Sequence, residues 1–164
     1  MQFVASEPKY HGTEDCAAAV AHAKGAAILR RPMSLVVQKY GGTSVGTLER
    51  IQRVAERVAD THREGHQVIV VVSAMAGETD RLLSMGWELS DGPAERERDV
   101  LVSSGEQVSA ALLAIQLNEI GVPARSMLGH QARIVTDNVH RKARIRTIDG
   151  TGLRSSLDTG NVLV

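Results

Sequence analysis

The pattern of apolar and polar positions becomes regular at Ser34 and predicts a strand, a helix and a second strand in succession. Residues 35–37 form a short, continuous apolar run that predicts a buried strand. From about residue 47 to residue 63 the apolar side chains recur at helical spacing, and Gly65 follows, so this stretch predicts an amphipathic helix. Residues 68–72 are all β-branched, which is typical of a central parallel strand. This order predicts a βαβ unit and an α/β fold.

Two further helical segments are expected. The first runs from Asp80 to Leu89 and ends at the sequence Asp91-Gly92-Pro93. Residues 95–120 are expected to hold two helical stretches, with a break or kink near Ser103-Ser104-Gly105. The second stretch is predicted to pack through one set of apolar side chains: Val108, Ala111, Leu112, Ile115 and Leu117.

The last part of the chain predicts short strands around one short helix. Residues 124–128 are expected to form a strand. Residues 133–136 and 143–147 alternate apolar and polar positions, which predicts a hairpin with one solvent-exposed face. A short helix near residues 153–157 leads to an apolar strand at residues 161–164. Because this core strand ends with the chain, we expect a truncated domain.

Composition excludes several classes of protein. The 164 residues, of which 43% are apolar and 23% charged, are enough for one globular domain. The net charge is zero and aromatic residues make up 2%, so neither nucleic acid nor a membrane is an expected partner. No apolar run approaches the roughly 18 residues that span a bilayer, and no secretory signal pattern opens the chain. Cys16 is the single cysteine, which excludes an internal disulfide framework and fits a cytoplasmic protein.

Residues 1–32 differ in composition from the rest of the chain. They are rich in Ala and Gly, and Gly25 and Pro32 bound a stretch with only a weak apolar face. We therefore expect residues 1–32 to be a flexible or weakly helical extension. The ordered domain is expected to comprise residues 33–164.

The sequence Lys39-Tyr40-Gly41-Gly42-Thr43-Ser44 follows the first strand and precedes the first helix, where open α/β sheets bind ligands. Adjacent glycines let backbone N–H groups approach an anion, and a helix N-terminus adds a favourable dipole. Lys39 can place its ammonium against a phosphate and offset the charge that develops in phosphoryl transfer. The Walker A pattern is absent. A tight turn with a solvated lysine explains this loop equally well when it is taken alone.

A second candidate loop, residues 73–80, follows the second strand. It lies beside the first loop if the sheet is parallel. Ser73 and Thr79 offer hydroxyl groups to a small polar substrate. A structural alternative is that Thr79 caps the helix that follows.

The third candidate is Ser103-Ser104-Gly105-Glu106. The spacing of Ser103 and Glu106 fits a capping box, which is a purely structural role. In the functional alternative, Glu106 faces a cleft and pairs with a substrate ammonium group. The pattern alone favours the capping box.

Three other features predict no chemistry. The predicted hairpin carries a run of basic residues, but without aromatic residues or a net positive charge this run is typical of a solvated face. The six histidines show no metal-ligand spacing, so no protein-bound metal is expected. Cys16 has no identifiable base and is not expected to act as a nucleophile.

Taken together, the three candidate loops resemble the aspartate kinases of the amino-acid kinase family. Residues 37–46 are similar to the opening signature of that family, usually K-F-G-G-T-S, and residues 71–75 with Thr79-Asp80 are similar to its second strand and loop. Ser103-Ser104-Gly105-Glu106-Gln107 resembles its S-x-G-E segment, and residues 129–134 with 143–145 resemble the hairpin that follows. The resemblance covers about residues 33–164. It does not cover residues 1–32.

The resemblance implies a three-layer α/β/α sandwich with a mainly parallel sheet. It also implies transfer of the γ-phosphoryl group of ATP, bound with Mg²⁺, to the side-chain carboxylate of L-aspartate. Lys39 takes the catalytic role, and Thr79 and Glu106 match the aspartate-binding positions, a role that is compatible with capping a helix at the same time. The positions implied for ATP or phosphate binding are Lys39, Tyr40, Gly41, Gly42, Thr43, Ser44 and Ser73. A homo-oligomer is implied for the full-length protein.

The chain departs from the family in two ways. The family continues into a second half that supplies an arginine for the substrate, a catalytic aspartate and the adenine site, so we expect this chain alone to be inactive. His140-Arg141-Lys142 stands where the family often has Gly after the His, which affects the hairpin turn. Two alternatives stay open: a non-catalytic α/β module that binds phosphate or a partner, and another amino-acid kinase, against which the opening hexapeptide and the S-x-G-E segment argue.

Overall fold

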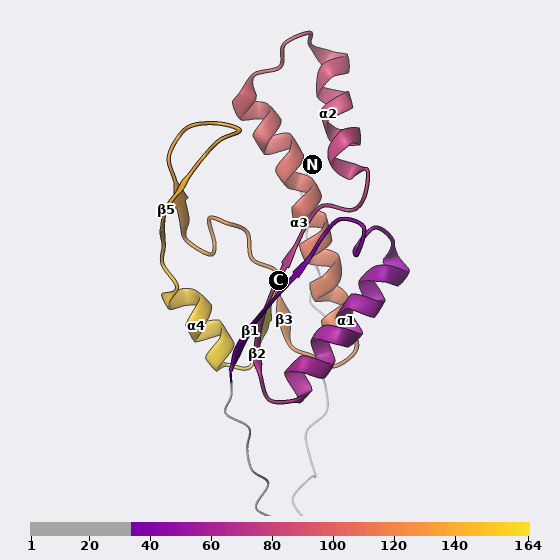
Figure 1. The fold of residues 1–164 in the computed structure, drawn as a ribbon, viewed down its shortest axis with the longest axis vertical. Helices are drawn as coiled ribbons and strands as arrows, with labels where there is room; N and C mark the ends of the chain where they lie inside the picture. The colour runs from indigo at the N-terminus through magenta and orange to yellow at the C-terminus, as the bar shows by residue number, and fades with distance from the viewer. Residues whose placement is uncertain (1–33) are drawn as a thin grey trace, which may run out of the picture.

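The computed structural model describes residues 34–164 of the chain (Figure 1). The extension expected over residues 1–32 lies outside these residues. The elements in chain order are β1 (Leu35–Tyr40), α1 (Leu48–Arg63), β2 (Gln67–Val72), α2 (Glu78–Leu89), α3 (Glu95–Glu119), β3 (Ala124–Arg125), β4 (Ile134–Thr136), β5 (Ile145–Ile148), α4 (Thr151–Asp158) and β6 (Val162–Leu163). Strands alternate with helices, and the predicted α/β class is confirmed.

The main sheet has four parallel strands in the order β1-β2-β6-β3, so β2 is an interior strand as predicted. β1 and β2 pair along their whole length, from Leu35 opposite Gln67 to Tyr40 opposite Val72. Because the two strands are parallel and end level, the loops that follow them leave the sheet at the same edge. β4 and β5 form a separate antiparallel hairpin, which confirms the predicted pairing.

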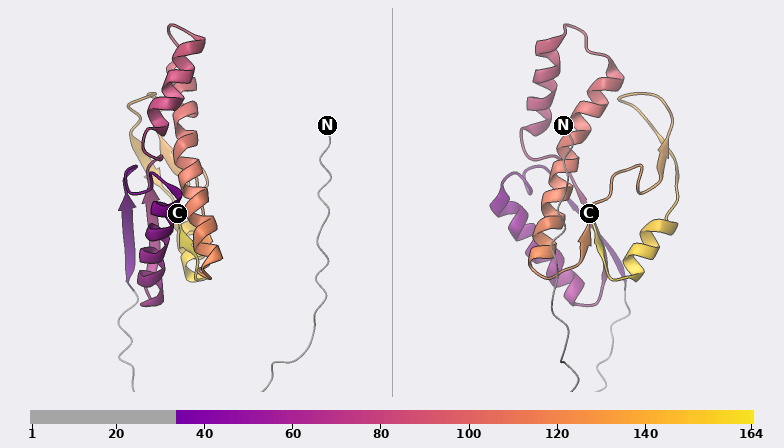
Figure 2. Two further views of the ribbon diagram at one scale, coloured as in Figure 1. Left: turned by 90° about the vertical axis from the view of Figure 1, so that its right-hand side faces the viewer. Right: turned by 180° about the vertical axis from the view of Figure 1, so that it is seen from behind.

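One face of the sheet carries the hydrophobic core. α1 and α3 pack against each other on this face, as Figure 2 shows. Val68 and Val70 of β2 contribute the sheet side of the core and are at most 2% exposed. Val58 of α1 and Leu113 of α3 meet them and are fully buried. The alternation along β2 therefore matches one buried and one less buried face.

The opposite face is covered mainly by α4, which lies on the other side of the sheet from α1 in Figure 1 and packs on β6 and β2. This arrangement gives the three layers that were expected. The prediction that residues 35–37 form a buried strand is wrong, because Leu35 is 44% exposed and Val37 60% exposed. β1 is the outermost strand of the described sheet, and its alternate side chains face away from α1. Val71 of β2 is also 47% exposed on this face.

α3 is one continuous helix of 25 residues, so the predicted break near Ser103-Ser104-Gly105 is wrong. The hydroxyl groups of Ser103 and Ser104 donate to the carbonyl oxygens of Val100 and Leu101, within the helix itself. They therefore do not compete with the helical backbone by forming a cap. By length and composition alone, α3 could cross a membrane, a test that the core helices of globular proteins also pass.

The predicted inner side of α3 is also wrong in part. Leu117 is fully buried as expected, but Val108 is 49% exposed and Ile115 65% exposed. The buried side instead carries mostly small residues together with two leucines: Gly105, Ser109, Ala110, Leu113, Ala114 and Leu117. Small side chains let α3 lie close to α1 and the sheet. This close approach explains why the side of α3 with the small residues is the buried side.

The remaining differences concern element ends and exposure. α2 begins at Glu78, two residues before the predicted start, and α4 is longer than predicted. β3 comprises only two residues, although residues 124–128 were expected to form a strand. All four residues of β5 are exposed, so this strand is exposed on both faces rather than on one.

Gly105 allows α3 to approach the loop after β2. A Cβ atom added to Gly105 would lie 2.9 Å from the Cβ atom of Ala74. We expect Gly105→Ala to lower the free energy of unfolding by about 1–3 kcal/mol, because overpacking outweighs the helix propensity of alanine. Gly152→Ala in α4 is the matched control, since its Cβ would meet no atom within 4 Å, and it should be neutral or stabilising. Urea unfolding checks this, and equal shifts in both variants would contradict it.

Asp149 links α4 to the base of the hairpin. Its Oδ1 accepts hydrogen bonds from the hydroxyl and the backbone N–H of Thr151, and its Oδ2 pairs with Arg133 at 2.7 Å. The Thr151 hydrogen bonds and then Arg133 lower the pKa of Asp149 from 3.8 to about 2. Because the folded-state pKa is depressed, the stabilisation is complete above the unfolded-state pKa and is lost as the pH falls through about 2.

Replacing Asp149 should therefore change how stability depends on acid. We expect Asp149→Asn to be less stable than the wild type at about pH 5 and to approach it near pH 2. Urea midpoints measured across this range check the prediction. A difference between the two proteins that does not depend on pH would argue against it.

Candidate functional site

The site is built where β1 and β2 end side by side. The backbone N–H of Ser73 donates to the carbonyl oxygen of Tyr40 at 3.1 Å and extends the pairing by one step past the strands. Residues 41–47 and 73–77 then leave the sheet at this shared edge. The prediction that the two loops lie beside each other is confirmed by this register.

The first loop is a tight turn packed against the second. The N–H of Ser44 donates to the carbonyl oxygen of Gly41 at 2.9 Å and closes the turn. A Cβ atom added to Gly42 would lie 2.7 Å from the carbonyl oxygen of Ala74, so no side chain fits there. Gly41 has open space on its Cβ side except for the Nζ atom of Lys39, which would be 3.8 Å away. The ammonium of Lys39 therefore lies close to the Gly41 turn.

Neighbouring side chains of β1 point to opposite faces of the sheet. Tyr40 faces α1, where its hydroxyl donates to the Oε1 atom of Gln38 at 2.9 Å, and Gln38 donates to Thr61 of α1. Burial raises the pKa of the Tyr40 hydroxyl. Lys39 faces the other way and is exposed. The structure thus places only the backbone of Tyr40 at the loop and leaves Lys39 free to meet an anion.

The N-terminus of α1 stands behind the first loop. Thr47 is the N-cap residue, and its side chain accepts a hydrogen bond from the N–H of Arg50 at 3.3 Å. The guanidinium of Arg50 donates a hydrogen bond back to the carbonyl oxygen of Thr43, and the side chain of Val45 is fully buried. The loop is therefore fixed at Thr43 and at Val45. Hydrogen bonding by Thr47 lowers the pKa of Glu49. Free N–H groups of the first turn add a partial positive charge on this side of the site.

Glu106 reaches the second loop from α3. Its Oε1 atom accepts a hydrogen bond from the N–H of Ala74 at 3.4 Å. The approach depends on the preceding residue, Gly105, which has no side chain to hold α3 away from Ala74. Glu106 is nevertheless an exposed residue of a continuous helix, so the capping-box interpretation is wrong. Its carboxylate is available to a ligand at the rim of the loop.

Thr79 lies in the first turn of α2 and is exposed. The N-cap residue of α2 is Gly77, with φ of 82°, so the alternative that Thr79 caps this helix is wrong. Glu78, next to it, pairs with Arg81, and this hydrogen bond lowers the pKa of Glu78. No hydrogen bond within residues 34–164 joins Thr79 to Lys39 or Glu106. Its role in substrate binding therefore stays a prediction.

A cavity of about 500 Å³ opens beside Glu106. Its floor is formed by residues 69–72 of β2 and 163–164 at the end of β6, one wall by Ser103, Glu106 and Gln107 of α3, and the other by residues 127–134. Most of this lining is apolar, and Glu106 is its acidic group. The sequence indicated Glu106 but missed the wall at residues 127–134, because a local pattern does not show which distant segment a residue faces.

Within residues 34–164, no group of three or more His, Cys, Asp or Glu side chains is arranged to hold a metal ion. The basic residues of the hairpin are largely engaged with carboxylates. Arg133 pairs with Asp149, and Arg146 pairs with Asp137. The described site therefore consists of a lysine above a glycine turn, a helix N-terminus, and a carboxylate at the mouth of an apolar cavity.

Known proteins resemble this chain in sequence. A model of the amino acid kinase family matches residues 34–164. The chain is 54% identical over 132 residues to the aspartokinase of Pseudomonas aeruginosa, which covers 80% of this chain and 32% of that protein. It is 50% identical over 132 residues to the aspartokinase of Geobacillus stearothermophilus, again with 80% and 32% coverage. The chain thus spans about a third of the length of the curated relatives it matches.

Solved structures of aspartate kinases are similar to this chain in fold. The crystal structure of aspartate kinase from Synechocystis superposes with a TM-score of 0.70 and 46% identity, covering 79% of this chain and 21% of that one. Escherichia coli aspartokinase III, in complex with aspartate and ADP, superposes with a TM-score of 0.60. At 22% identity, over 80% of this chain and 40% of that one, the second likeness shows the fold alone. By sequence and by fold, the chain belongs to the amino acid kinase family.

Proposed function

We propose that this chain is part of an aspartate kinase, which transfers the γ-phosphoryl group of ATP to the side-chain carboxylate of L-aspartate. The product is 4-phospho-L-aspartate, a precursor of lysine, threonine and methionine. The observation that carries the proposal is 54% identity to an aspartokinase across the segment that contains the Lys39 loop and Glu106. The non-catalytic alternative is not favoured, because the relatives matched over this segment are kinases.

The proposed reaction depends on positioning of the reactants and on charge stabilisation more than on acid–base catalysis. The attacking side-chain carboxylate is already ionised at neutral pH, since its ordinary pKa is about 4. One of its oxygen atoms forms a bond to the γ-phosphorus, and the bond from that phosphorus to the bridging oxygen of ADP breaks. Both partners are anions, so the main barrier is their mutual repulsion. Mg²⁺, carried in by ATP, supplies part of the neutralising charge.

Lys39 is proposed to supply the chain's own positive charge at this step. Its ammonium lies near the Gly41 turn, with the Nζ atom 3.8 Å from the position that a Cβ atom of Gly41 would take. Backbone N–H groups of the turn and of the first turn of α1 add directed partial charges on the same side. These groups are held before any ligand arrives, because Val45 is buried and the turn is hydrogen-bonded.

Glu106 is proposed to bind the ammonium group of aspartate, with Thr79 as a further hydroxyl contact. The hydrogen bond from the Ala74 N–H fixes one oxygen of Glu106 next to the loop that also packs on Gly42. An aspartate held there has its reactive side chain within the region between the two loops. We further propose a cytoplasmic, homo-oligomeric enzyme, which the single cysteine and the family resemblance support.

The two proposed ligands give separate tests. Because the chain spans about a third of its relatives, binding is a more direct readout than turnover. Lys39→Ala should weaken the binding of ATP with Mg²⁺ at least about tenfold, through loss of a charge-assisted contact. Arg53→Ala on α1 removes the same charge from an exposed position and is the control. Isothermal titration calorimetry checks this, and equal losses in the two variants would contradict the role of Lys39.

Glu106→Gln should weaken the binding of L-aspartate about tenfold and leave the affinity for ATP unchanged. Glutamine can still accept the hydrogen bond from Ala74, so the loop should stay in place. Glu119→Gln, at the exposed end of the same helix, removes one negative charge and should have no effect. If the wild type binds neither ATP nor L-aspartate in calorimetry, the proposed function is wrong for this chain.

A further inference from the structure

The tip of the β4–β5 hairpin touches the N-terminal part of α3 through polar contacts. The backbone N–H of Arg141 donates to the Oδ2 atom of Asp99 at 2.9 Å. The Nδ1 atom of His140 lies 3.3 Å from the same oxygen. The guanidinium of Arg141 donates to the Oε1 atom of Glu95 at 3.3 Å. Two carboxylates one helical turn apart therefore hold one hairpin tip.

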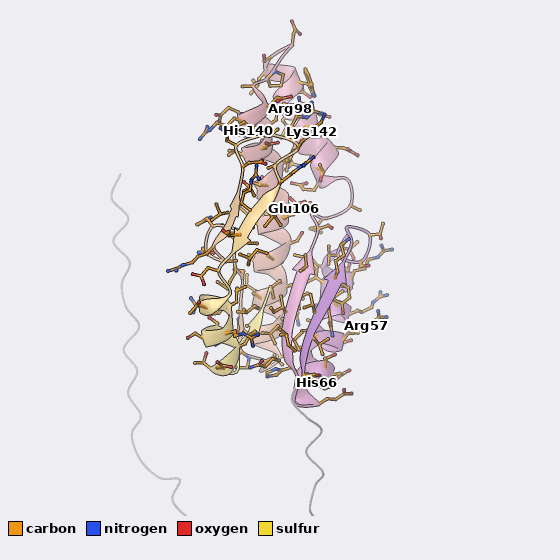
Figure 3. The ribbon with its side chains drawn as sticks, turned by 60° about the vertical axis from the view of Figure 1, so that its left-hand side comes forward. Arg57, His66, Arg98, Glu106, His140 and Lys142 are labelled. Carbon is orange, nitrogen blue, oxygen red and sulfur yellow. The ribbon has the colours of Figure 1, made fainter. Side chains whose placement is uncertain are left out.

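These carboxylates lie on the side of α3 that borders the cavity. Glu95, Asp99 and Ser103 follow one another at intervals of four residues, and Glu106 follows after three. Residues at this spacing share one face of a helix. Figure 3 shows His140 beside the N-terminal part of α3, with Glu106 further along the same helix. The contact at the tip is thus in line with the cavity wall that α3 forms.

The base of the hairpin is fixed at the opposite side of the cavity. The N–H of Met127 donates to the carbonyl oxygen of Val164 at 2.8 Å, which joins residues 127–134 to the end of β6. The ion pair between Arg133 and Asp149 closes the base at 2.7 Å. The segment from Met127 to Ile134 lines the cavity directly. With both ends held, the hairpin and its leading segment form one side of the cavity.

The hold at the tip is weak and therefore reversible. All four residues of β5 are exposed, so apolar packing does little to fix this strand of the hairpin. The contact of His140 with Asp99 and the ion pair of Arg141 with Glu95 are also partly or fully exposed, and such surface contacts add little to stability. Arg141 has φ of 62°, a conformation that glycine favours and that is uncommon for arginine. The backbone N–H of the same residue makes the hydrogen bond to Asp99.

We propose that Asp99 is a positioning residue for the amino-acid substrate. By holding Arg141 and His140, it keeps the hairpin against α3 and keeps the wall at residues 127–134 in place opposite Glu106. The proposal rests on the proposed function, because the substrate concerned is the aspartate that Glu106 would bind. Asp99 does not contact that substrate and has no part in holding ATP.

Asp99→Ala tests the proposal through two measurements on the full chain. Hydrogen exchange should accelerate about fivefold or more for the amides of residues 134–148, and the Kd for L-aspartate should rise about three- to tenfold. The Kd for ATP with Mg²⁺ should stay unchanged. Asp99→Asn keeps an acceptor for the Arg141 N–H and should restore most of the aspartate affinity. Glu97→Ala, on the same turn of α3 and exposed, is the matched control.

Each result decides a different point. Unchanged exchange in Asp99→Ala would overturn the role of Asp99 in holding the hairpin. Faster exchange with an unchanged aspartate Kd would overturn the positioning role. Equal losses of aspartate and ATP affinity would point to a general structural defect and would also overturn it. If the wild type binds no aspartate, the proposed function and the positioning role fail together, whereas the exchange comparison still decides whether Asp99 holds the hairpin.

Discussion

The close packing around Ala74 is the constraint on which the candidate site depends. Its carbonyl oxygen leaves no room for a side chain at Gly42, its Cβ atom leaves none at Gly105, and its N–H is bound by Glu106. One small residue thereby joins the turn after β1, the loop after β2 and the middle of α3. The proposed phosphate and amino-acid subsites are adjacent because these three segments meet at this point.

The sequence predicted the βαβ core and the order of the loops well, because β2 and α1 carry strong and unambiguous periodicities. It failed where one pattern fits two structures. Ser103 and Glu106 have capping-box spacing, yet they lie inside α3, because serine hydroxyl groups can bond back to the helix that contains them. Likewise the short apolar run at the start of β1 did not reveal whether one or both faces of the strand are covered.

The candidate site was predictable only in part, for a related reason. Lys39 and Glu106 belong to short motifs with a definite order, and both the loop after Lys39 and the α3 segment of Glu106 meet the loop at Ala74. Tyr40 belongs to the same motif, but strand alternation turns its side chain toward α1, where it bonds to Gln38. The wall formed by residues 127–134 faces residues that are distant in the sequence. The contact between Arg141 and Asp99 joins residues that are 42 positions apart. Local sequence patterns carry no information about such pairs.

The uncovered part of the sheet has a practical consequence for handling the protein. Leu35, Val37 and Val71 lie on one face of two paired strands and are each at least 44% exposed. Neighbouring apolar side chains of this kind favour contact with other hydrophobic surfaces, including dyes, detergents and column matrices. Fluorescence of a hydrophobic probe would therefore report a natively folded chain as partly open, and light scattering would rise with concentration before any unfolding occurs.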